Sequence, residues 1–551
     1  MIVLYKDERP TKTICKIKKL LKKLGIKIQI ERFWCSVPGT VSVRVYLKSI
    51  PTVGTNGKGN NYEEALASAL GELMERLQNS CLYKLPYYYN NEKSFYYAPD
   101  EVRIGNCGEI LEGILEECEI GNIKRLIDAS AYKELGVPYY SIGRECVQVL
   151  PIAGVNNLYG SNGMCAGNNF YEAAVNGMCE ILERYACRQI LRERIVLPTV
   201  SECGLNLCKE NLRKLEAIRE RFHVELKDCS LSEGYPIIGI YIEDKKEKKY
   251  ILKIAAHPVI DIAVSKVINE VMQGNSLEGN SLFRSFSKNY NYYERIEEIL
   301  KYGIAPYYDG KREEVQISQN FYTIGKNISN KELFIFVSSL VEKKGYEILI
   351  RDVSFLGFPS FHIIVPHMSE IYDYEDISSI INRIEQENEF RDYIIDCLRE
   401  NAIISRNQTV NLFDIFDVEY GHNSPLEVEI GVLYNLVVSL RKGKTQNAKR
   451  YISIYQEWLI ENGQDELYVL YNQVLEWLNG EKSNKRVAEY IKALTFKEIP
   501  KCFSREKRSF CSTCIYAEQC PEKRIIEIHS RLEKIYEKNC PVQGKEMFYQ
   551  R

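Results

Sequence analysis

The sequence lacks the features that mark exported, membrane-spanning and nucleic-acid-binding proteins. Its first residues, MIVLYKDERPTKTICK, contain no long apolar run of the kind found in a signal peptide, and no uncharged apolar stretch of roughly 18 residues follows that could span a bilayer. Its 73 Lys and Arg residues are balanced by 75 Asp and Glu residues, so there is no overall basic footprint for a phosphate backbone. We therefore expect a cytoplasmic protein that contacts neither a membrane nor nucleic acid directly.

Two familiar nucleotide-binding loops are also absent. The segment GTNGKGNN, residues 54–61, has glycines and a lysine, but it matches neither G-x-x-x-x-G-K-[ST] nor G-x-G-x-x-G. A nucleotide site in this chain would therefore be neither a Walker site nor a Rossmann site.

The chain is long enough for several folded units. With 551 residues, of which 45% are hydrophobic and 27% charged, it should form a large core with smaller modules. Residues 1–405 mix amphipathic helices with β-rich runs such as TVSVRVYL, PIIGIYI and YEILIRDV, which predicts an α+β domain with antiparallel sheets. Residues 420–497 have apolar positions at helical spacing and Gly-containing stops, which predicts helical hairpins reminiscent of tetratricopeptide repeats. Residues 498–551 form a Cys-rich tail.

Four cysteines of this tail are spaced like metal ligands, in the pattern C-x8-C-x2-C-x5-C: Cys502, Cys511, Cys514 and Cys520. Four thiolates close together suit zinc or an iron-sulfur cluster, and the spacing does not separate the two. The alternative is four unrelated thiols, because most of the 18 cysteines are expected to be reduced core residues.

An internal duplication is the most informative feature of the sequence. GNNYEEALASALGELMER (residues 59–76) and GNNFYEAAVNGMCEILER (residues 167–184) are identical at eight of their eighteen positions. Each copy follows an Asn-Gly pair, at residues 56–57 and 162–163, which predicts a turn before each helix.

The duplicated helix carries paired glutamates on one side. With 3.6 residues per turn, Glu72 and Glu75 lie opposite a row of leucines, and Glu180 and Glu183 repeat this arrangement. If the two copies pack as symmetry mates, four carboxylates face one another and require cations, for which Mg²⁺ is well suited. The alternative is two amphipathic surface helices with ordinary Glu-Arg pairs. The repeated E-x-x-E-R spacing favours a metal-phosphate site, because a solvated face does not constrain the spacing of its charges.

Four segments resemble successive signature blocks of the YcaO family: TNGKG…ALASALGELMERL, YGSNGMCAGNNFYEA…EILERY, AAHPVIDIAVSKVINEVMQG and IIVPHMSEIYDYED. The resemblance runs from the N-terminus through the helical C-terminal part. It implies a YcaO-type core with internally duplicated sheet-and-helix halves, Mg-ATP as cofactor and a homodimer. The family reaction is phosphorylation of a backbone amide oxygen after attack by a nucleophile, which depends mostly on positioning and electrostatic stabilisation.

The resemblance also implies roles for residues at matching positions, although it identifies no catalytic side chain. The magnesium ions that bridge the ATP phosphates would be held by Glu72, Glu75, Glu180 and Glu183. The nucleotide site would be lined by Lys6, Thr13, Cys165, Asn168, Glu172, Arg184, Lys266 and Glu270. For Lys6 and Thr13 the alternative is an exposed terminal arm.

Two positions depart from the family pattern. Cys165 stands where relatives have Ser or Ala, which weakens any hydroxyl contact to phosphate. Lys266 stands where relatives carry Arg, four residues before the Glu of the E-x-x-Q motif, here Glu270 and Gln273. Lysine keeps the charge but lacks the planar fork, so a phosphate contact would survive as a point charge.

Three functions stay open on the sequence alone. The first is an ATP-dependent enzyme, or the partner of a modifying enzyme, that acts on a peptide or protein amide, such as an accessory factor in ribosomal-protein methylthiolation. The second is a non-catalytic adaptor that binds ATP as a folding cofactor. The third is an azoline- or thioamide-forming peptide synthetase, although the chain ends in GKEMFYQR and not in the proline-rich tail of many azoline-forming relatives.

Overall fold

The computed structural model describes most of residues 6–400, the helices between 435 and 496, and residues 531–549. The positions outside this description are 1–5, 49, 80–94, 96, 106–116, 131–133, 202–204, 206, 274–282, 286–295, 297–298, 300–302, 309, 311–314, 316–327, 371–376, 401–434, 462–464, 482–484, 497–530 and 550–551. The four cysteines of the predicted tail site, Cys502, Cys511, Cys514 and Cys520, lie outside the described residues, as do the predicted domain boundaries.

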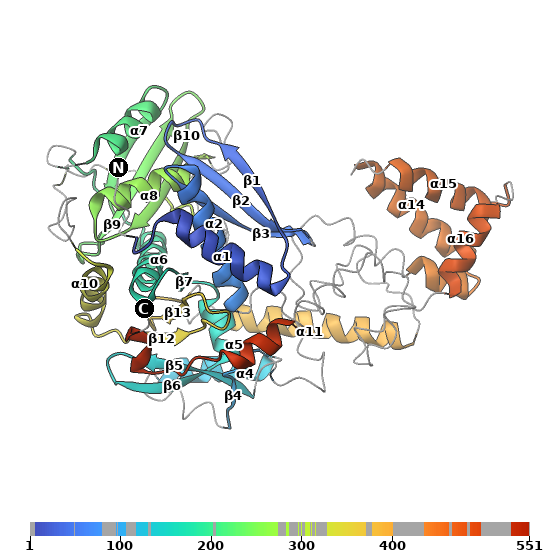
Figure 1. The fold of residues 1–551 in the computed structure, drawn as a ribbon. Helices are drawn as coiled ribbons and strands as arrows, with labels where there is room; N and C mark the ends of the chain where they lie inside the picture. The colour runs from blue at the N-terminus through green and yellow to red at the C-terminus, as the bar shows by residue number, and fades with distance from the viewer. Residues whose placement is uncertain are drawn as a thin grey trace.

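The first of three sheets is built from β1 (Ile28–Trp34), β2 (Val41–Leu47) and β3 (Ile50–Gly59), in that order (Figure 1). The alternating sequence VSVRVYL of β2 buries its valines and Leu47. Helix α2 (Tyr62–Gln78) packs against β2 and β3, and α1 (Pro10–Leu24) packs against α2. The leucines of α2 that the sequence placed opposite the glutamates are buried in this core.

The second sheet has the order β11-β10-β9-β8. Helix α8 packs against β9 and β10, α7 packs against α8 and β8, and α6 contacts β10. The elements are α6 (Phe170–Glu193), α7 (Lys209–Arg219), β8 (His223–Asp228), β9 (Ile237–Asp244), β10 (Lys249–Ala256), α8 (Ile260–Val271) and β11 (Arg284–Ser285).

The third sheet has the order β4-β5-β12-β13-β7, with β6 paired to β5. Its strands are β4 (Val102–Arg103), β5 (Leu135–Ser141), β6 (Cys146–Pro151), β7 (Met164–Ala166), β12 (Leu349–Asp352) and β13 (Ser360–Ile364). Near it lie α4 (Glu117–Ala129), α5 (Ile152–Gly154) and the π-helix η1 (Val155–Tyr159), while α10 (Asn330–Glu342) packs against α6. All pairs between named strands are antiparallel, which confirms that prediction.

The two copies of the repeat begin in the same way. Asn61 caps α2 and Asn169 caps α6, each by accepting a hydrogen bond from the backbone N–H three residues later. A Cβ atom on Gly59 or on Gly167 would lie 2.7 Å from the backbone nitrogen of the alanine six residues later. The glycine therefore lets the strand approach the helix closely in both copies.

One predicted turn is wrong. The Asn-Gly pair at residues 56–57 lies inside β3, where Asn56 and Gly57 pair with Arg44 and Val43 of β2. The strand continues through the pair because the backbone of Gly57 packs directly against α2, and a Cβ atom there would lie 2.0 Å from the carbonyl oxygen of Ala65. The pair at residues 162–163 does form a turn, with Gly163 at a φ of 82°.

The C-terminal part is helical, as predicted, although nothing in its geometry identifies tetratricopeptide repeats. It consists of α11 (Ile377–Arg399), a helix at residues 435–441, α14 (Thr445–Glu461), α15 (Asp465–Leu478) and α16 (Lys485–Phe496). Helices α14, α15 and α16 pack in sequence and lie to one side of the sheets (Figure 1). Tyr455 and Tyr471 meet edge to face with ring centroids 4.9 Å apart.

The last described segment returns to the core. It contains a helix at residues 531–538 and the 3₁₀-helix η4 (Lys545–Tyr549). Tyr536 donates a hydrogen bond to the carbonyl of Leu77 at 2.5 Å, and the side chain of Gln543 hydrogen-bonds both backbone groups of Asp352. The last part of the Cys-rich tail, residues 531–549, is therefore held against α2 and β12.

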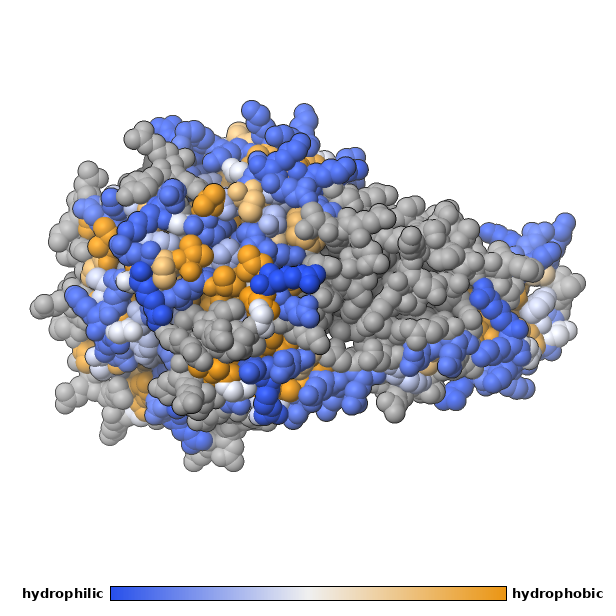
Figure 2. All heavy atoms as spheres, turned by 90° about the horizontal axis from the view of Figure 1, so that it is seen from below, coloured by the Kyte–Doolittle hydropathy of each residue, from blue (hydrophilic) through white to orange (hydrophobic). Residues whose placement is uncertain are grey.

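The molecular surface is mixed in character. On the face shown in Figure 2, hydrophobic side chains gather in small groups among hydrophilic ones over the body that holds the sheets. No helix among the described residues is long and apolar enough to cross a membrane.

Candidate functional site

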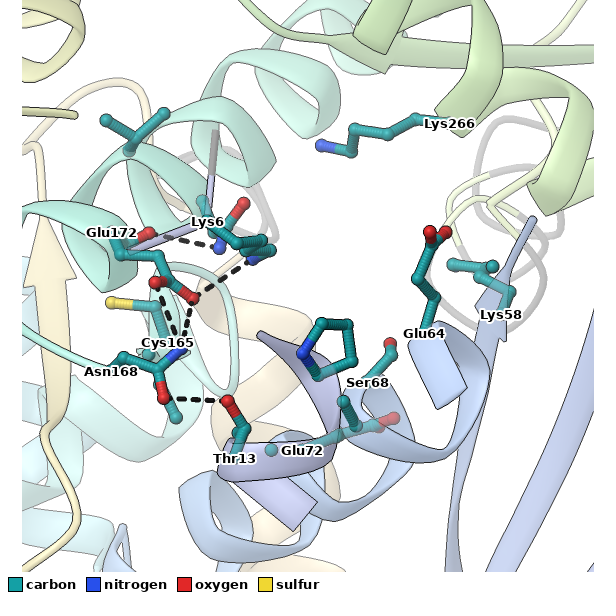
Figure 3. A pocket seen from close by; sticks show the side chains of 18 of the residues that line it. Lys6, Thr13, Lys58, Glu64, Ser68, Glu72, Cys165, Asn168, Glu172 and Lys266 are labelled. Carbon is teal, nitrogen blue, oxygen red and sulfur yellow. Dashed lines mark hydrogen bonds and ion pairs between the residues drawn. The ribbon is translucent and has the colours of Figure 1, made fainter. Parts of the chain in front are cut away.

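A cavity of about 310 Å³ opens between the two copies of the repeat. Its walls come from α1, α2, β7, the first half of α6 and α8 (Figure 3). Of the twelve residues predicted for the nucleotide and magnesium site, nine line this cavity: Lys6, Thr13, Glu72, Glu75, Cys165, Asn168, Glu172, Glu180 and Lys266. Residues that the sequence analysis assigned to one site, although they are far apart in the chain, therefore line one cavity.

Three of the four predicted magnesium ligands lie on the cavity wall, Glu72 and Glu75 from α2 and Glu180 from α6. Burial raises the pKa of Glu72, and the charge of Glu180 adds to this, against the nearby Arg76. Burial raises the pKa of Glu75 well above its usual range, and repulsion from Glu180 and Glu72 adds to it. The charge of Glu180 thus disfavours the charged forms of Glu72 and Glu75, a cost that a divalent cation would offset.

The fourth predicted ligand, Glu183, lies beside the cavity and not on its wall. Its Oε1 accepts hydrogen bonds from the backbone N–H of Ala256 at 2.7 Å and from Nζ of Lys266 at 3.1 Å. Burial raises the pKa of Glu183, and Lys266 opposes this rise. Three of the four expected carboxylates therefore line the cavity. The fourth, Glu183, is instead bound by the end of β10 and by a lysine of α8.

Arg184 and Glu270 also lie outside the cavity lining. Nε of Arg184 donates to Oε1 of Glu180 at 3.0 Å, within α6. Glu270 forms an ion pair with Lys58; burial would raise the pKa of Glu270, but Lys58 and other lysines outweigh it and lower that pKa. Lys266 points into the cavity in Figure 3, and Lys58 also lines it. Lys58 forms an ion pair with Glu270 and Lys266 forms one with Glu183, and neither of these glutamates lines the cavity.

The N-terminal arm is anchored at the start of α6. Oγ1 of Thr13 donates to Oδ1 of Asn168 at 2.8 Å, and Nδ2 of Asn168 donates to both carboxylate oxygens of Glu172 at 3.1 Å. Nζ of Lys6 lies 3.4 Å from Oε1 of Glu172, which is buried (Figure 3). The alternative of an exposed arm is therefore wrong for Thr13, which is buried, and Lys6 is tied to the cavity wall by its ion pair.

Sequence reasoning missed the first-copy counterparts of Asn168 and Glu172. Asn60 and Glu64 occupy the same positions in the repeat and also line the cavity. The sequence contained the signal for these two residues. Both copies share Gly-Asn-Asn and Glu-Ala at aligned positions, so the roles assigned in the second copy could have been assigned to the first copy as well.

Asn60 also ties the start of α2 to two neighbouring helices. Its Oδ1 accepts hydrogen bonds from Nζ of Lys214 at 2.6 Å, from Oγ of Ser265 at 3.0 Å and from Nδ2 of Asn269 at 3.3 Å. Burial lowers the pKa of Lys214, so this acceptor stabilises a lysine that lies almost entirely out of solvent. The first half of the cavity is therefore held rigidly against α7 and α8.

The residues present fit Mg²⁺ bound together with phosphates. In the described part of the chain, no three His, Cys, Asp or Glu side chains lie close enough to hold a metal ion on their own. Mg²⁺ commonly uses one or two carboxylates, several waters and the phosphates of its substrate. Glu72 and Glu180 line the cavity from different copies of the repeat, and Lys58 and Lys266 also line it and supply positive charge.

Comparisons with known proteins name one family. Residues 56–369 match the family model described as YcaO cyclodehydratase, ATP- and Mg²⁺-binding. The chain is 28% identical over 401 residues to the ribosomal protein S12 methylthiotransferase accessory factor YcaO of Escherichia coli, covering 68% of this chain and 67% of that protein. It is 26% identical over 422 residues to an uncharacterized protein of Haemophilus influenzae, covering 72% and 70%. It is also similar to the structure of YcaO from Methanopyrus kandleri bound with AMPPCP and Mg²⁺, with 18% identity, a TM-score of 0.43, and coverage of 66% of this chain and 92% of that one.

Proposed function

Because the chain belongs to the YcaO family, we propose that the cavity between α2 and α6 binds Mg-ATP and that the protein uses it on an amide of a peptide or protein. One observation carries the proposal. Two copies of one motif place Glu72 and Glu180 at the same cavity, and the charge of Glu180 helps to raise the pKa of Glu72. Such a pair is costly unless cations sit between the carboxylates and an anionic ligand.

The cavity residues divide into three groups by what they can do. Glu72, Glu75 and Glu180 hold the magnesium ions, with water and phosphate oxygens completing the coordination. Lys58 and Lys266 contact the phosphates as point charges, since neither has the planar fork of arginine. Glu183 and Glu270 hold these two lysines in place from behind.

The N-terminal arm closes one side of the proposed nucleotide site. Lys6 and Thr13 reach the cavity through their contacts with Glu172 and Asn168, and Cys165 also lines it. Burial raises the pKa of the Cys165 thiol well above its usual range, so Cys165 is a neutral packing residue and not a nucleophile. Bound Mg-ATP supplies an electrophilic phosphoryl group that can convert an amide oxygen into a leaving group.

For the cellular role we propose an accessory factor that works with a modifying enzyme on a ribosomal protein. The E. coli relative that is named a ribosomal protein S12 methylthiotransferase accessory factor supports this role. The helices α14, α15 and α16 offer a surface for the partner enzyme, and a homodimer stays a prediction from the family. A peptide synthetase and a non-catalytic ATP-binding adaptor are the competing roles.

Isothermal titration calorimetry with ATP, in the presence and absence of Mg²⁺, tests the site. Glu72→Gln and Glu180→Gln should each weaken Mg-dependent ATP binding by at least tenfold, while Glu63→Gln serves as the matched control because Glu63 is an exposed residue of the same helix outside the cavity. Equal affinity in all three variants would place the nucleotide elsewhere. ATP turnover by the unmodified protein then separates an enzyme from an adaptor, which binds ATP without hydrolysing it.

A further inference from the structure

The exposed side of α1 carries lysines and almost no opposing charge. The lysine face, as we call it, consists of Lys12, Lys16, Lys18, Lys19, Lys22 and Lys23, all of which are exposed. Lysines at intervals of three or four residues form a single row along the helix, which consists of Lys12, Lys16, Lys19 and Lys23. The opposite side of α1 is buried against the core through residues such as Ile17 and Leu21.

This arrangement is unfavourable for the helix itself. Like charges three or four residues apart destabilise a helix by about 0.2–0.5 kcal/mol per pair. The helix dipole favours Lys22 and Lys23, which lie in the last turn of α1, but it does not favour Lys12, Lys16 and Lys19, which lie before that turn. Lys12 pairs with Glu8, but Lys18, Lys19, Lys22 and Lys23 have no ion-pair partner among the described residues. Folding alone therefore does not account for the lysine face, whereas an anionic partner would.

The first part of the lysine face lies near the proposed nucleotide cavity. Pro10 and Thr13 of α1 line that cavity, and Figure 3 shows Thr13 directed into it. Nζ of Lys16 lies 5.2 Å from the ring centroid of Phe358, which is another lining residue. A chain that lies along α1 would therefore arrive at the cavity at its Lys12 and Lys16 end.

We propose that the lysine face is a docking surface for an acidic segment of the polypeptide substrate, next to the amide that enters the cavity. This inference rests on the proposed function. In an extended peptide, side chains on one side lie about 6.6 Å apart. Successive lysines of the row lie about 4.5–6 Å apart along the helix axis, so carboxylates at alternate peptide positions can each meet a lysine.

A peptide suits this surface better than RNA does. The whole chain has a net charge of −2, so it lacks the overall excess of basic residues that binding to a phosphate backbone usually requires. The row also contains no arginine, the residue that recognises phosphate through two parallel hydrogen bonds. Its continuity with a site for amide chemistry favours a polypeptide, which can occupy both places at once.

Fluorescence anisotropy of the full-length protein with Mg-ATP tests the proposal. The probe is a fluorescein-labelled peptide of alternating glutamate and glycine, and an oligouridylate of similar length is measured beside it. The variant is Lys19→Glu combined with Lys23→Glu, and the control is Lys209→Glu combined with Arg213→Glu, two exposed basic residues four positions apart on α7. Thermal unfolding and ATP affinity are measured on both variants.

We expect the Lys19 and Lys23 variant to bind the acidic peptide at least fivefold more weakly, with unchanged ATP affinity, while the α7 control binds as the unmodified protein does. Raising the salt concentration should weaken peptide binding to the unmodified protein. Equal peptide binding by the two variants would overturn the proposal, and so would tighter binding of the oligouridylate than of the peptide. If the unmodified protein does not bind ATP, the proposed function itself is refuted.

Discussion

Glu72 of α2 and Glu180 of α6 occupy the same position in two copies of one motif, and both line the same cavity. Asn60 and Asn168, and likewise Glu64 and Glu172, are related in the same way. The repeat is therefore a feature of the site as well as of the sequence, since each half of the cavity is built from the same residue types.

The equivalence of the two glutamates leads to a prediction about the metal-free protein. Glu180→Gln removes a negative charge that helps to raise the pKa of Glu72 and Glu75, so it should lower both pKa values and raise the melting temperature without Mg²⁺. Differential scanning calorimetry in a chelator, and again with Mg-ATP, measures the effect. With Mg-ATP the order should reverse, because the unmodified protein gains more from the ligand. If Glu63→Gln shifted the melting temperature by the same amount, the effect would come from loss of any negative charge and not from the position of Glu180.

The raised pKa of Glu75 predicts how stability depends on pH. The folded protein holds a proton on Glu75 at pH values where the unfolded chain has lost it, so this group stabilises the fold below its unfolded pKa. That contribution should disappear as the pH rises from the unfolded pKa towards the folded one. Urea unfolding of the metal-free protein across this range should show the decline, and Glu75→Gln should make it shallower. A steeper decline in that variant would contradict the assignment.

The close approach at the repeat glycines predicts a large cost for a small substitution. An alanine at Gly59 or at Gly167 would bring its Cβ atom to 2.7 Å from a backbone nitrogen, so strand and helix would have to separate. We expect a loss of about 1–3 kcal/mol in the free energy of unfolding for each. Gly121→Ala, in α4, is the matched control because a Cβ atom there meets nothing within 4 Å, and it should stabilise the helix by up to about 1 kcal/mol. Both effects are measured by urea unfolding.

The pairing of Lys266 with Glu183 predicts non-additive energetics. Lys266→Ala leaves a partly buried carboxylate without its cation, so it should reduce stability by about 1–3 kcal/mol and raise the pKa of Glu183 further. Lys266→Ala together with Glu183→Gln should be less destabilised than the sum of the two single variants. A double-mutant cycle in urea measures this coupling. A coupling energy near zero would show that the two side chains do not depend on each other.

Removal of one hydroxyl group tests the contact between the C-terminal segment and α2. The Tyr536 hydroxyl donates to the carbonyl of Leu77, which belongs to the last turn of α2, so Tyr536→Phe leaves that buried carbonyl without a donor. The free energy of unfolding should fall by about 1 kcal/mol. Tyr490→Phe is a control in the helical module, where the tyrosine hydroxyl lies 3.2 Å from that of Tyr471. Hydrogen exchange at the end of α2 should accelerate only in the first variant.

The sequence by itself determined the local elements and the composition of the site. The alternation of VSVRVYL produced β2, and the leucine row of α2 was buried because apolar residues at helical spacing gain most by leaving water together. The duplicated motif identified Glu72, Glu75 and Glu180 as partners because two helices with the same pattern start from equivalent strands. The strand and helix patterns depend on residues that are near one another in the chain, and the repeat relates two such patterns that are far apart in it.

Only the tertiary structure decided which of these residues face the cavity. Glu183 occupies the same position in the repeat as Glu75, yet the end of β10 and Lys266 of α8 hold it beside the cavity. The pair Asn56-Gly57 reads as a turn, but packing against α2 keeps it in a strand. In both cases the deciding contact comes from a different element, which no local pattern of charge or propensity can specify.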